Sequence, residues 1–395
     1  MQNSFVKKFN FQIDERTLLL VIPFLLVYKA YWIITGLYMG FVLLYFLLGQ
    51  YRYNNFKAEV PNLFAWVLLL TWGMYITLKS PILYSGVIYY LGTIVIPFMT
   101  FFIVLNLDLT KEYLDKFFSL MFIAGSILGL YSFYIFSSSG FNFLMRIPSL
   151  WDDFNIMSTF LMIVSMFNLS MIINRPRSNK IVFYVTTLAF TYLGILLAQT
   201  RGVWLAIIVS ILIYIIKKPK IVVPALFLFA IVGLFFSNIL IDRFLSVKNF
   251  GYDASSLGRL QAWYSSFILI LQNPFMGYGF DSYIFLRDSV FSFYIVKVLH
   301  PHNTYLRVIL EMGLIGFILY FSFYVRAFFY TFRFSSTSKI YDKYKVFIDG
   351  LQLSFIGLTI TFMFEPYFSL YGGSVFVIWF LISLSFKLEK LKLTT

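Results

Sequence analysis

Long uninterrupted runs of apolar residues recur along the whole chain and are separated by short polar segments. Each run extends over roughly 20 residues, the length that an α-helix needs to cross the hydrocarbon core of a bilayer. The runs are continuous, whereas the strands of a transmembrane β-barrel would alternate in hydrophobicity over about ten residues. We therefore predict an all-α integral membrane protein, because helices satisfy the backbone hydrogen bonds inside a bilayer.

The limits of the apolar runs predict about twelve transmembrane helices in a single polytopic domain, residues 1–395. The run over 17–50 holds Lys29 as its only charged residue, so it forms either two short spans or one long tilted span. We expect the first span to be retained, because no small-residue cleavage site follows Lys7 and Lys8. The predicted spans are 16–29, 31–50, 61–79, 83–107, 115–136, 154–174, 181–199, 202–216, 221–241, 304–325, 348–364 and 370–386.

Basic residues gather in the short segments between these runs and predict how the chain is oriented in the membrane. With both termini in the cytoplasm, about two thirds of the 31 Lys and Arg residues fall on the cytoplasmic side, as the positive-inside rule requires. This distribution explains the net charge of +14 without a nucleic-acid partner. The chain has no Cys and only two His, which excludes disulfides and argues against a conventional zinc site. We expect neither a metal nor a cofactor.

One long segment between the predicted spans, residues 242–303, lies on the external side in this orientation. Loops of this length in compact proteins are usually functional or disordered. Part of this loop has apolar residues at helical spacing, between a cap at Ser255 or Ser256 and a stop at Asn273 and Pro274. We predict an amphipathic helix along the outer membrane surface. The residues that recur at helical spacing are Leu260, Trp263, Tyr264, Phe267, Ile270 and Leu271.

Two arginines on the predicted outer face are candidates for binding an anion. Arg201 lies at an external hairpin, and Gly202 leaves the first amides of the next helix open to an anion. Arg259 lies in the first turn of the loop helix, where the helix dipole disfavours a cation and an anionic ligand would compensate. The alternatives are a snorkelling arginine for Arg201 and a solvated surface arginine for Arg259. Two guanidinium groups together suit a diphosphate, because each matches phosphate oxygens bidentately.

Both histidines of the chain precede a predicted membrane helix. His302 stands at the mouth of this helix on the outer face, where an imidazole can remove a hydroxyl proton near neutral pH. The alternative is an interfacial histidine that donates to a carbonyl, and His300 is interpreted as structural. Asn303 or Thr304 is the candidate N-cap of this helix. Arg307 and Glu311 lie one turn apart on one helix face, and we favour a supporting ion pair over a direct catalytic role.

Two arginines, a histidine and an amphipathic helix at one membrane face suit glycosyl transfer from a lipid diphosphate. Arginines can stabilise a diphosphate leaving group without a metal. The short cytoplasmic loops leave no room for a sugar-nucleotide domain, so the donor would be membrane-borne. A secondary transporter or flippase is an alternative, although transporters tend to show paired halves and polar groups near the midplane. A non-catalytic membrane scaffold is a further alternative, and it would need no such set of residues.

Four segments of the chain form an ordered set of motifs, namely QTRGVWLA at 199–206, GRLQAW at 258–263, NPFMGYGFDSY at 273–283 and HNTYLRVILEMGLIG at 302–316. A looser element, DDFNIMSTFLM at 152–162, surrounds Asn155. Together these segments resemble motifs of the O-antigen ligase/polymerase superfamily of bacterial envelope glycosyltransferases, the WaaL and Wzy types. The motif-level resemblance covers about residues 150–320.

The resemblance implies a GT-C-like enzyme of lipopolysaccharide biosynthesis in the bacterial inner membrane, with its site on the periplasmic face. It implies a metal-independent, inverting transfer of a glycan from undecaprenyl (polyprenyl) diphosphate. By motif position, Arg201 and Arg259 would bind the diphosphate, and His302 would deprotonate the acceptor hydroxyl. The acceptor is lipid A–core in a ligase, which the size and the single outer loop favour. In a polymerase, the alternative, the acceptor is a second lipid-linked glycan.

Overall fold

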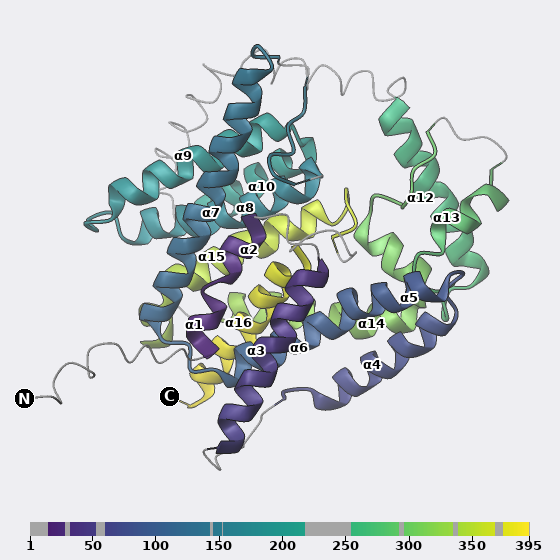
Figure 1. Ribbon diagram of the computed structural model, residues 1–395, viewed down its shortest axis with the longest axis horizontal. Coiled ribbons are helices and arrows are strands. Elements are labelled where there is room, and N and C mark those ends of the chain that lie inside the picture. The colour runs from purple at the N-terminus through teal and green to yellow at the C-terminus, as the bar shows by residue number, and fades with distance from the viewer. Residues whose placement is uncertain are drawn as a thin grey trace, which may run out of the picture.

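The computed structural model describes residues 15–27, 32–52, 60–142, 145–151, 153–217, 254–291, 296–334, 339–367 and 374–394. Within these ranges every regular element is a helix (Figure 1). In the described part of the chain, five helices are long and apolar enough to cross a membrane, which agrees with the predicted all-α membrane protein. These helices are Leu83–Asn106, Lys111–Ser138, Phe154–Asn174, Ile181–Ala198 and Thr304–Phe332.

Most of the predicted spans correspond to observed helices with shifted ends. Helix α14 continues seven residues beyond the predicted end at 325 to Phe332, and α15 begins at Lys339 instead of 348. The predicted span 221–241 and residues 242–253 of the outer loop lie outside the described residues. The helices that match predicted spans are α3 (Trp32–Arg52), α4 (Leu63–Leu78), α7 (Lys111–Ser138), α8 (Phe154–Asn174), α9 (Ile181–Ala198), α10 (Arg201–Lys217), α14 (Thr304–Phe332), α15 (Lys339–Thr361) and α16 (Ser374–Thr394).

The first predicted span, 16–29, is not one helix in the structure. The chain forms two short helices, α1 (Glu15–Leu19) and α2 (Ile22–Val27), with a turn between them. Pro23 explains this break, because proline lacks an amide hydrogen and its ring clashes with the carbonyl four residues earlier. The same effect acts in the span 83–106, where a π-helical turn, η2 (Leu91–Val95), separates α5 (Leu83–Tyr90) from α6 (Ile96–Asn106) just before Pro97.

Helix α8 is the central helix of the bundle. It packs against α7, α9 and α15. In its most apolar stretch 89% of the residues are buried, compared with 50–56% in the other four long apolar helices. Its first turn nevertheless contains polar side chains that are buried, among them Asn155, Ser158 and Thr159. Buried polar groups require hydrogen-bond partners, so the amino-terminal end of α8 is the place where chemistry inside the bundle is expected.

Helix α14 is broken at Gly313, and the motif at 273–283 completes the break. Gly313 has φ 68°, and the carbonyls of Leu310 and Glu311 accept hydrogen bonds from the amides of Tyr278 and Gly279, each at 3.0 Å. On the other side of the break, the amide of Leu314 donates to the Pro274 carbonyl at 2.8 Å. Irregular backbone inside a membrane protein is tolerated where protein satisfies it, as here. These bonds fix the outer loop against α14.

The amphipathic helix predicted in the outer loop is present as α12 (Ala254–Gln272). Its apolar stripe of Leu260, Tyr264, Phe267 and Leu271 points away from the protein, and these side chains are 40–61% exposed. The opposite face is packed against the protein through small residues and one leucine, namely Ala262, Ser265, Ser266 and Leu269. Two short helices, α13 (Tyr283–Leu286) and η4 (Arg287–Ser289), follow in the same loop.

Candidate functional site

A cavity of about 440 Å³ lies between the α9–α10 turn, α12 and the segment that follows α15. Both predicted arginines, Arg201 and Arg259, line it. The other polar residues that line it include Arg146, Asn155 and Glu365. Its apolar part is formed by Val203, Leu205, Leu260, Trp263 and Phe364. A cavity of this size, with a few polar groups in an apolar lining, has the character of a small-molecule site.

Arg201 enters the cavity because the turn between α9 and α10 is very tight. Gln199 adopts a left-handed conformation with φ 52° and ends α9, so Arg201 is the first residue of α10. Gly202 permits a close approach to Phe364, since a Cβ at this position would lie 2.9 Å from that ring. Arg201 and the next residues of α10 therefore both line the cavity, where a helix amino terminus and a guanidinium group can stabilise an anion.

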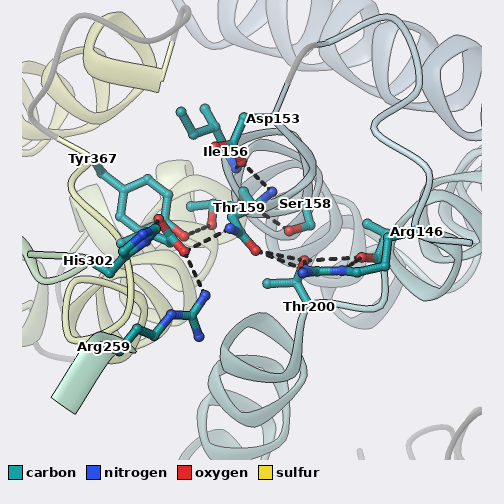
Figure 2. A network of polar contacts seen from close by, with 12 residues as sticks. Arg146, Asp153, Ile156, Ser158, Thr159, Thr200, Arg259, His302 and Tyr367 are labelled. Carbon is teal, nitrogen blue, oxygen red and sulfur yellow. Dashed lines mark hydrogen bonds and ion pairs between the residues drawn. The ribbon is translucent and has the colours of Figure 1, made fainter. Parts of the chain in front are cut away.

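Glu365 is the centre of the polar network in this cavity, and sequence reasoning missed it. Its side chain is 3% exposed. Oε1 accepts hydrogen bonds from Asn155 Nδ2 at 2.7 Å and from Arg259 Nη2 at 3.2 Å, and Oε2 lies 2.9 Å from His302 Nδ1 (Figure 2). The carboxylate thus links α8, α12 and the start of α14. One feature of the sequence could have identified Glu365. It is an acidic residue directly after the predicted span 348–364, and acidic groups in membrane segments are rare and usually functional.

His302 is held in place at the mouth of α14, behind Glu365. The imidazole is 21% exposed and contacts the Glu365 carboxylate, and it is Glu365, rather than His302, that is among the described residues lining the cavity. Asn303 is the N-cap of α14, as predicted, because its side chain accepts a hydrogen bond from the Leu306 amide at 3.0 Å. Thr304 Oγ1 donates to the Glu365 carbonyl at 2.5 Å, which ties the two segments together.

Arg307 and Glu311 form the predicted ion pair, and this pair lies apart from the main cavity. Arg307 Nε donates to Glu311 Oε1 at 2.8 Å, and both side chains are buried. The guanidinium group also lies over the Tyr89 ring, 5.1 Å from its centroid. The described lining of the main cavity includes neither residue. The ion pair is therefore confirmed, and its supporting role stays a prediction.

Arg146 is a third arginine in the cavity that sequence reasoning did not select. Its Nη2 donates to Asn155 Oδ1 at 3.1 Å and to Thr200 Oγ1 at 3.3 Å, and its Nε donates to the Ala198 carbonyl at 3.2 Å. The guanidinium group also stacks over the Phe154 ring, 3.4 Å from its centroid. Asn155 consequently accepts from Arg146 and donates to Glu365, which fixes the orientation of its amide.

Among the described residues, three arginines and one carboxylate line the cavity, which gives this lining an excess of positive charge. Asp153 lies nearby as the N-cap of α8, where Oδ1 accepts from the amides of Asn155 at 2.6 Å and Ile156 at 3.0 Å. Burial and the neighbouring Glu365 raise the pKa of Asp153. Burial, with the nearby His302, Arg307 and Arg259, lowers the pKa of His300 well below its usual value, so His300 is neutral at neutral pH. The cavity therefore suits an anionic ligand.

His300, His302 and Glu365 are the one group of described residues whose donor atoms could surround a metal ion, within 4.8 Å of one another. Both oxygens of Glu365 already accept hydrogen bonds, one of them from the Arg259 guanidinium. The positive guanidinium would repel a divalent cation at this point and would offset the attraction between the cation and the carboxylate. We therefore assign this carboxylate to Arg259 and His302, and not to a metal.

Residues 185–321 match the family model described as O-antigen ligase. A search of curated proteins gave no match to the chain. The matched segment contains Arg201, Arg259 and His302, whereas Asn155 and Glu365 lie on either side of it. The family match agrees with the resemblance that the sequence motifs carry. The match over residues 185–321 therefore supports the assignment to the O-antigen ligase/polymerase superfamily that the motifs indicate.

Proposed function

We propose that this protein is a membrane glycosyltransferase that transfers a glycan from polyprenyl diphosphate to an acceptor sugar hydroxyl, as an O-antigen ligase. The observation that carries the proposal is the cavity itself. Two arginines from separate motifs of the matched segment line one cavity, and a carboxylate in the same cavity contacts the histidine of a third motif. The excess of positive charge fits a diphosphate, and the apolar part of the lining fits the first units of a prenyl chain.

The proposed reaction uses each of these groups once. Arg201 and Arg259 bind the donor diphosphate, and the amino-terminal end of α10 adds its amides. His302 accepts the proton of the acceptor hydroxyl, whose oxygen then attacks the anomeric carbon of the donor. The bond between that carbon and the diphosphate oxygen breaks, and polyprenyl diphosphate leaves with both bonding electrons. The arginines stabilise its charge, and direct displacement inverts the anomeric centre.

The proposal places the cavity at the periplasmic face of the bacterial inner membrane, in a GT-C-like protein of about twelve spans with cytoplasmic termini and residues 242–303 outside. The exposed apolar stripe of α12 supports this placement, because such a stripe suits a helix at the membrane interface. Leu260 belongs to this stripe and also lines the cavity. The exposed Leu205 on α10 lines the cavity as well. The prenyl chain would leave the cavity between these two leucines and continue into the bilayer.

The proposal is tested with purified protein, a polyprenyl-diphosphate oligosaccharide and lipid A–core. We expect glycan to be joined to lipid A–core, also in the presence of EDTA. The variants Arg201→Ala, Arg259→Ala and His302→Ala should each lose at least about 100-fold in rate. Each substitution removes either an arginine that stabilises the leaving diphosphate or the base that accepts the proton. Arg333→Ala, at an exposed arginine away from the cavity, is the matched control.

The same assay separates the competing functions. Extension of the lipid-linked glycan in the absence of lipid A–core would identify a polymerase of the same superfamily. Movement of the lipid-linked glycan across liposome membranes without any transfer would identify a flippase and contradict the proposal. Full activity of the His302→Ala variant would remove this histidine as the base.

A further inference from the structure

We propose that Glu365 is a positioning residue that couples donor binding to the base: the diphosphate and Glu365 compete for Arg259, and Arg259 and His302 share the charge of Glu365. This inference rests on the proposed function, because it assigns a role within that reaction. Neither the matched family segment nor the predicted motifs include Glu365. The argument depends on the three side chains that meet at its two oxygens.

The first step concerns the tautomer of His302. A buried ionised carboxylate accepts hydrogen bonds and has none to donate, so Nδ1 of His302 is the donor in its 2.9 Å contact with Glu365 Oε2. The proton on Nδ1 leaves the lone pair on Nε2 free to receive the proton of the acceptor hydroxyl. The carboxylate also stabilises the imidazolium that forms during the reaction, as oriented carboxylate–histidine pairs do.

The second step concerns Arg259, which Glu365 shares with the donor. Arg259 Nη2 lies 3.2 Å from Glu365 Oε1, and the same arginine lines the cavity in which the diphosphate is proposed to bind. Without donor, the guanidinium neutralises much of the carboxylate charge. A bound diphosphate attracts the guanidinium and leaves more of the Glu365 charge for His302, because nearby opposite charges favour the protonated imidazole. The base is therefore strengthened when the donor is in place.

The third step concerns the side chains that hold Glu365 still. Asn155 Nδ2 donates to Oε1 at 2.7 Å, and Arg146 binds the other end of the same amide at 3.1 Å (Figure 2). The Thr304 hydroxyl holds the Glu365 backbone carbonyl at 2.5 Å. The carboxylate consequently keeps a partner and a fixed position when Arg259 turns toward the donor, which a shared charge requires.

The test is the isosteric variant Glu365→Gln, with two independent measurements. Binding of undecaprenyl diphosphate to the purified protein gives the donor Kd, and transfer at saturating donor gives kcat. We expect kcat to fall about 10²–10⁴-fold, as expected when the partner of a catalytic histidine is lost. The donor Kd should decrease, because Arg259 no longer has a competing carboxylate. Glu365→Asp, which keeps the charge, should recover part of the lost kcat.

Opposite effects on the two quantities distinguish this role from a structural one. A joint loss of donor affinity and kcat, or an unchanged kcat, would overturn the inference. Glu311→Gln is the matched control, because Glu311 is a buried carboxylate that pairs with a different arginine, Arg307. This control should leave the donor Kd unchanged. If the unmodified protein binds the donor but transfers nothing, the proposed function fails. The Kd comparison still decides whether Glu365 competes for Arg259, and a weaker Kd in Glu365→Gln would overturn that part.

Discussion

The amide of Asn155 shows how strongly one side chain can constrain this cavity. It receives a hydrogen bond from Arg146 on its oxygen and donates one from its nitrogen to Glu365 at 2.7 Å. The amide oxygen must face Arg146 and the amide nitrogen must face Glu365. A flipped amide would lose both hydrogen bonds, so the amide has a single arrangement in this network. This position therefore requires a side chain with one acceptor and one donor, and a side chain of the same size without them would not suffice.

Asn155→Asp tests this restriction, because it preserves the size and changes the donor into a second acceptor. Two carboxylates would then face each other at hydrogen-bond distance, and like charges this close disfavour each other. We expect the transfer rate to fall at least about 10-fold, since one of the carboxylates must take up a proton or move. Asn106→Asp, in a helix away from the cavity, is the control for adding a carboxylate, and initial rates with both variants measure the effect.

The candidate residues that sequence reasoning found and missed differ in how local their signals are. Arg201 and His302 each lie at a helix start, a property that neighbouring residues reveal. Arg259 lies in the second turn of α12, and not in the first turn as predicted, because the helix begins at Ala254. Glu365 can be recognised as a site residue only through its contacts with residues 63 and 106 positions earlier in the chain. Such pairings result from the packing of α8, α12 and α14, and no spacing within one element predicts them.

At the scale of elements, the break in α14 is the feature that most depends on one residue. Gly313 has φ 68°, a region that disfavours side chains, and a Cβ there would meet the backbone carbonyl of Phe275. Gly313→Ala should lower the free energy of unfolding by about 2 kcal/mol or more, from strain and from separation of the outer loop. Thermal unfolding in detergent measures this loss. Gly40→Ala is the control, because a Cβ there meets nothing within 4 Å, and an equal loss in both variants would contradict this explanation.

The N-cap of α8 gives a prediction that depends on pH. The pKa of Asp153 is raised by burial and by Glu365, so the folded state binds the proton of this carboxyl more tightly than the unfolded state does. Its contribution to stability is present below the unfolded pKa and is lost as the pH rises through the folded pKa. Asp153→Asn removes the charge and keeps a capping side chain. The variant should therefore have a higher Tm than the parent at pH 7.

Measurement of the Tm across pH checks the sign of this effect. The difference between the Asp153→Asn variant and the parent should shrink as the pH falls, because the raised pKa makes the folded parent take up this proton before the unfolded chain does. A variant that is less stable at pH 7 and gains relative stability in acid would show that the ionised cap is favourable. That result would contradict the direction of the pKa shift.

Helix positions were largely predictable from the sequence because hydrophobic length determines them in a membrane protein. The failures have local causes. Pro23 divides the first predicted span into α1 and α2, and polar residues at 339–347 are helical although they lack a membrane-like composition. Helix α12 was predicted from its spacing, and its apolar stripe is exposed because small residues occupy the face that packs. The break in α14 depends on backbone contacts with the 273–283 motif, which no periodicity reveals.

At the scale of the molecule, the proposed orientation is open to a clean chemical test, since the chain has no cysteine. Lys297 lies in the outer loop and Lys343 on the proposed cytoplasmic side, and both are exposed. A membrane-impermeant maleimide should label Lys297→Cys in spheroplasts, and should label Lys343→Cys only after the membrane is opened. The unmodified chain is the control. Labelling of Lys343→Cys in intact spheroplasts would reverse the proposed topology.

The position of Glu365 outside the matched segment has a practical consequence for anyone who divides this chain. Residues 185–321 contain the motif arginines and the histidine, but Asn155 precedes them and Glu365 follows them. A fragment cut at the limits of sequence similarity would keep the residues that identify the family and lose the carboxylate that holds two of them together. Swapping this segment between relatives would likewise separate Arg259 and His302 from their shared partner. The unit of exchange in such chimaeras should therefore extend from Arg146 through Tyr367.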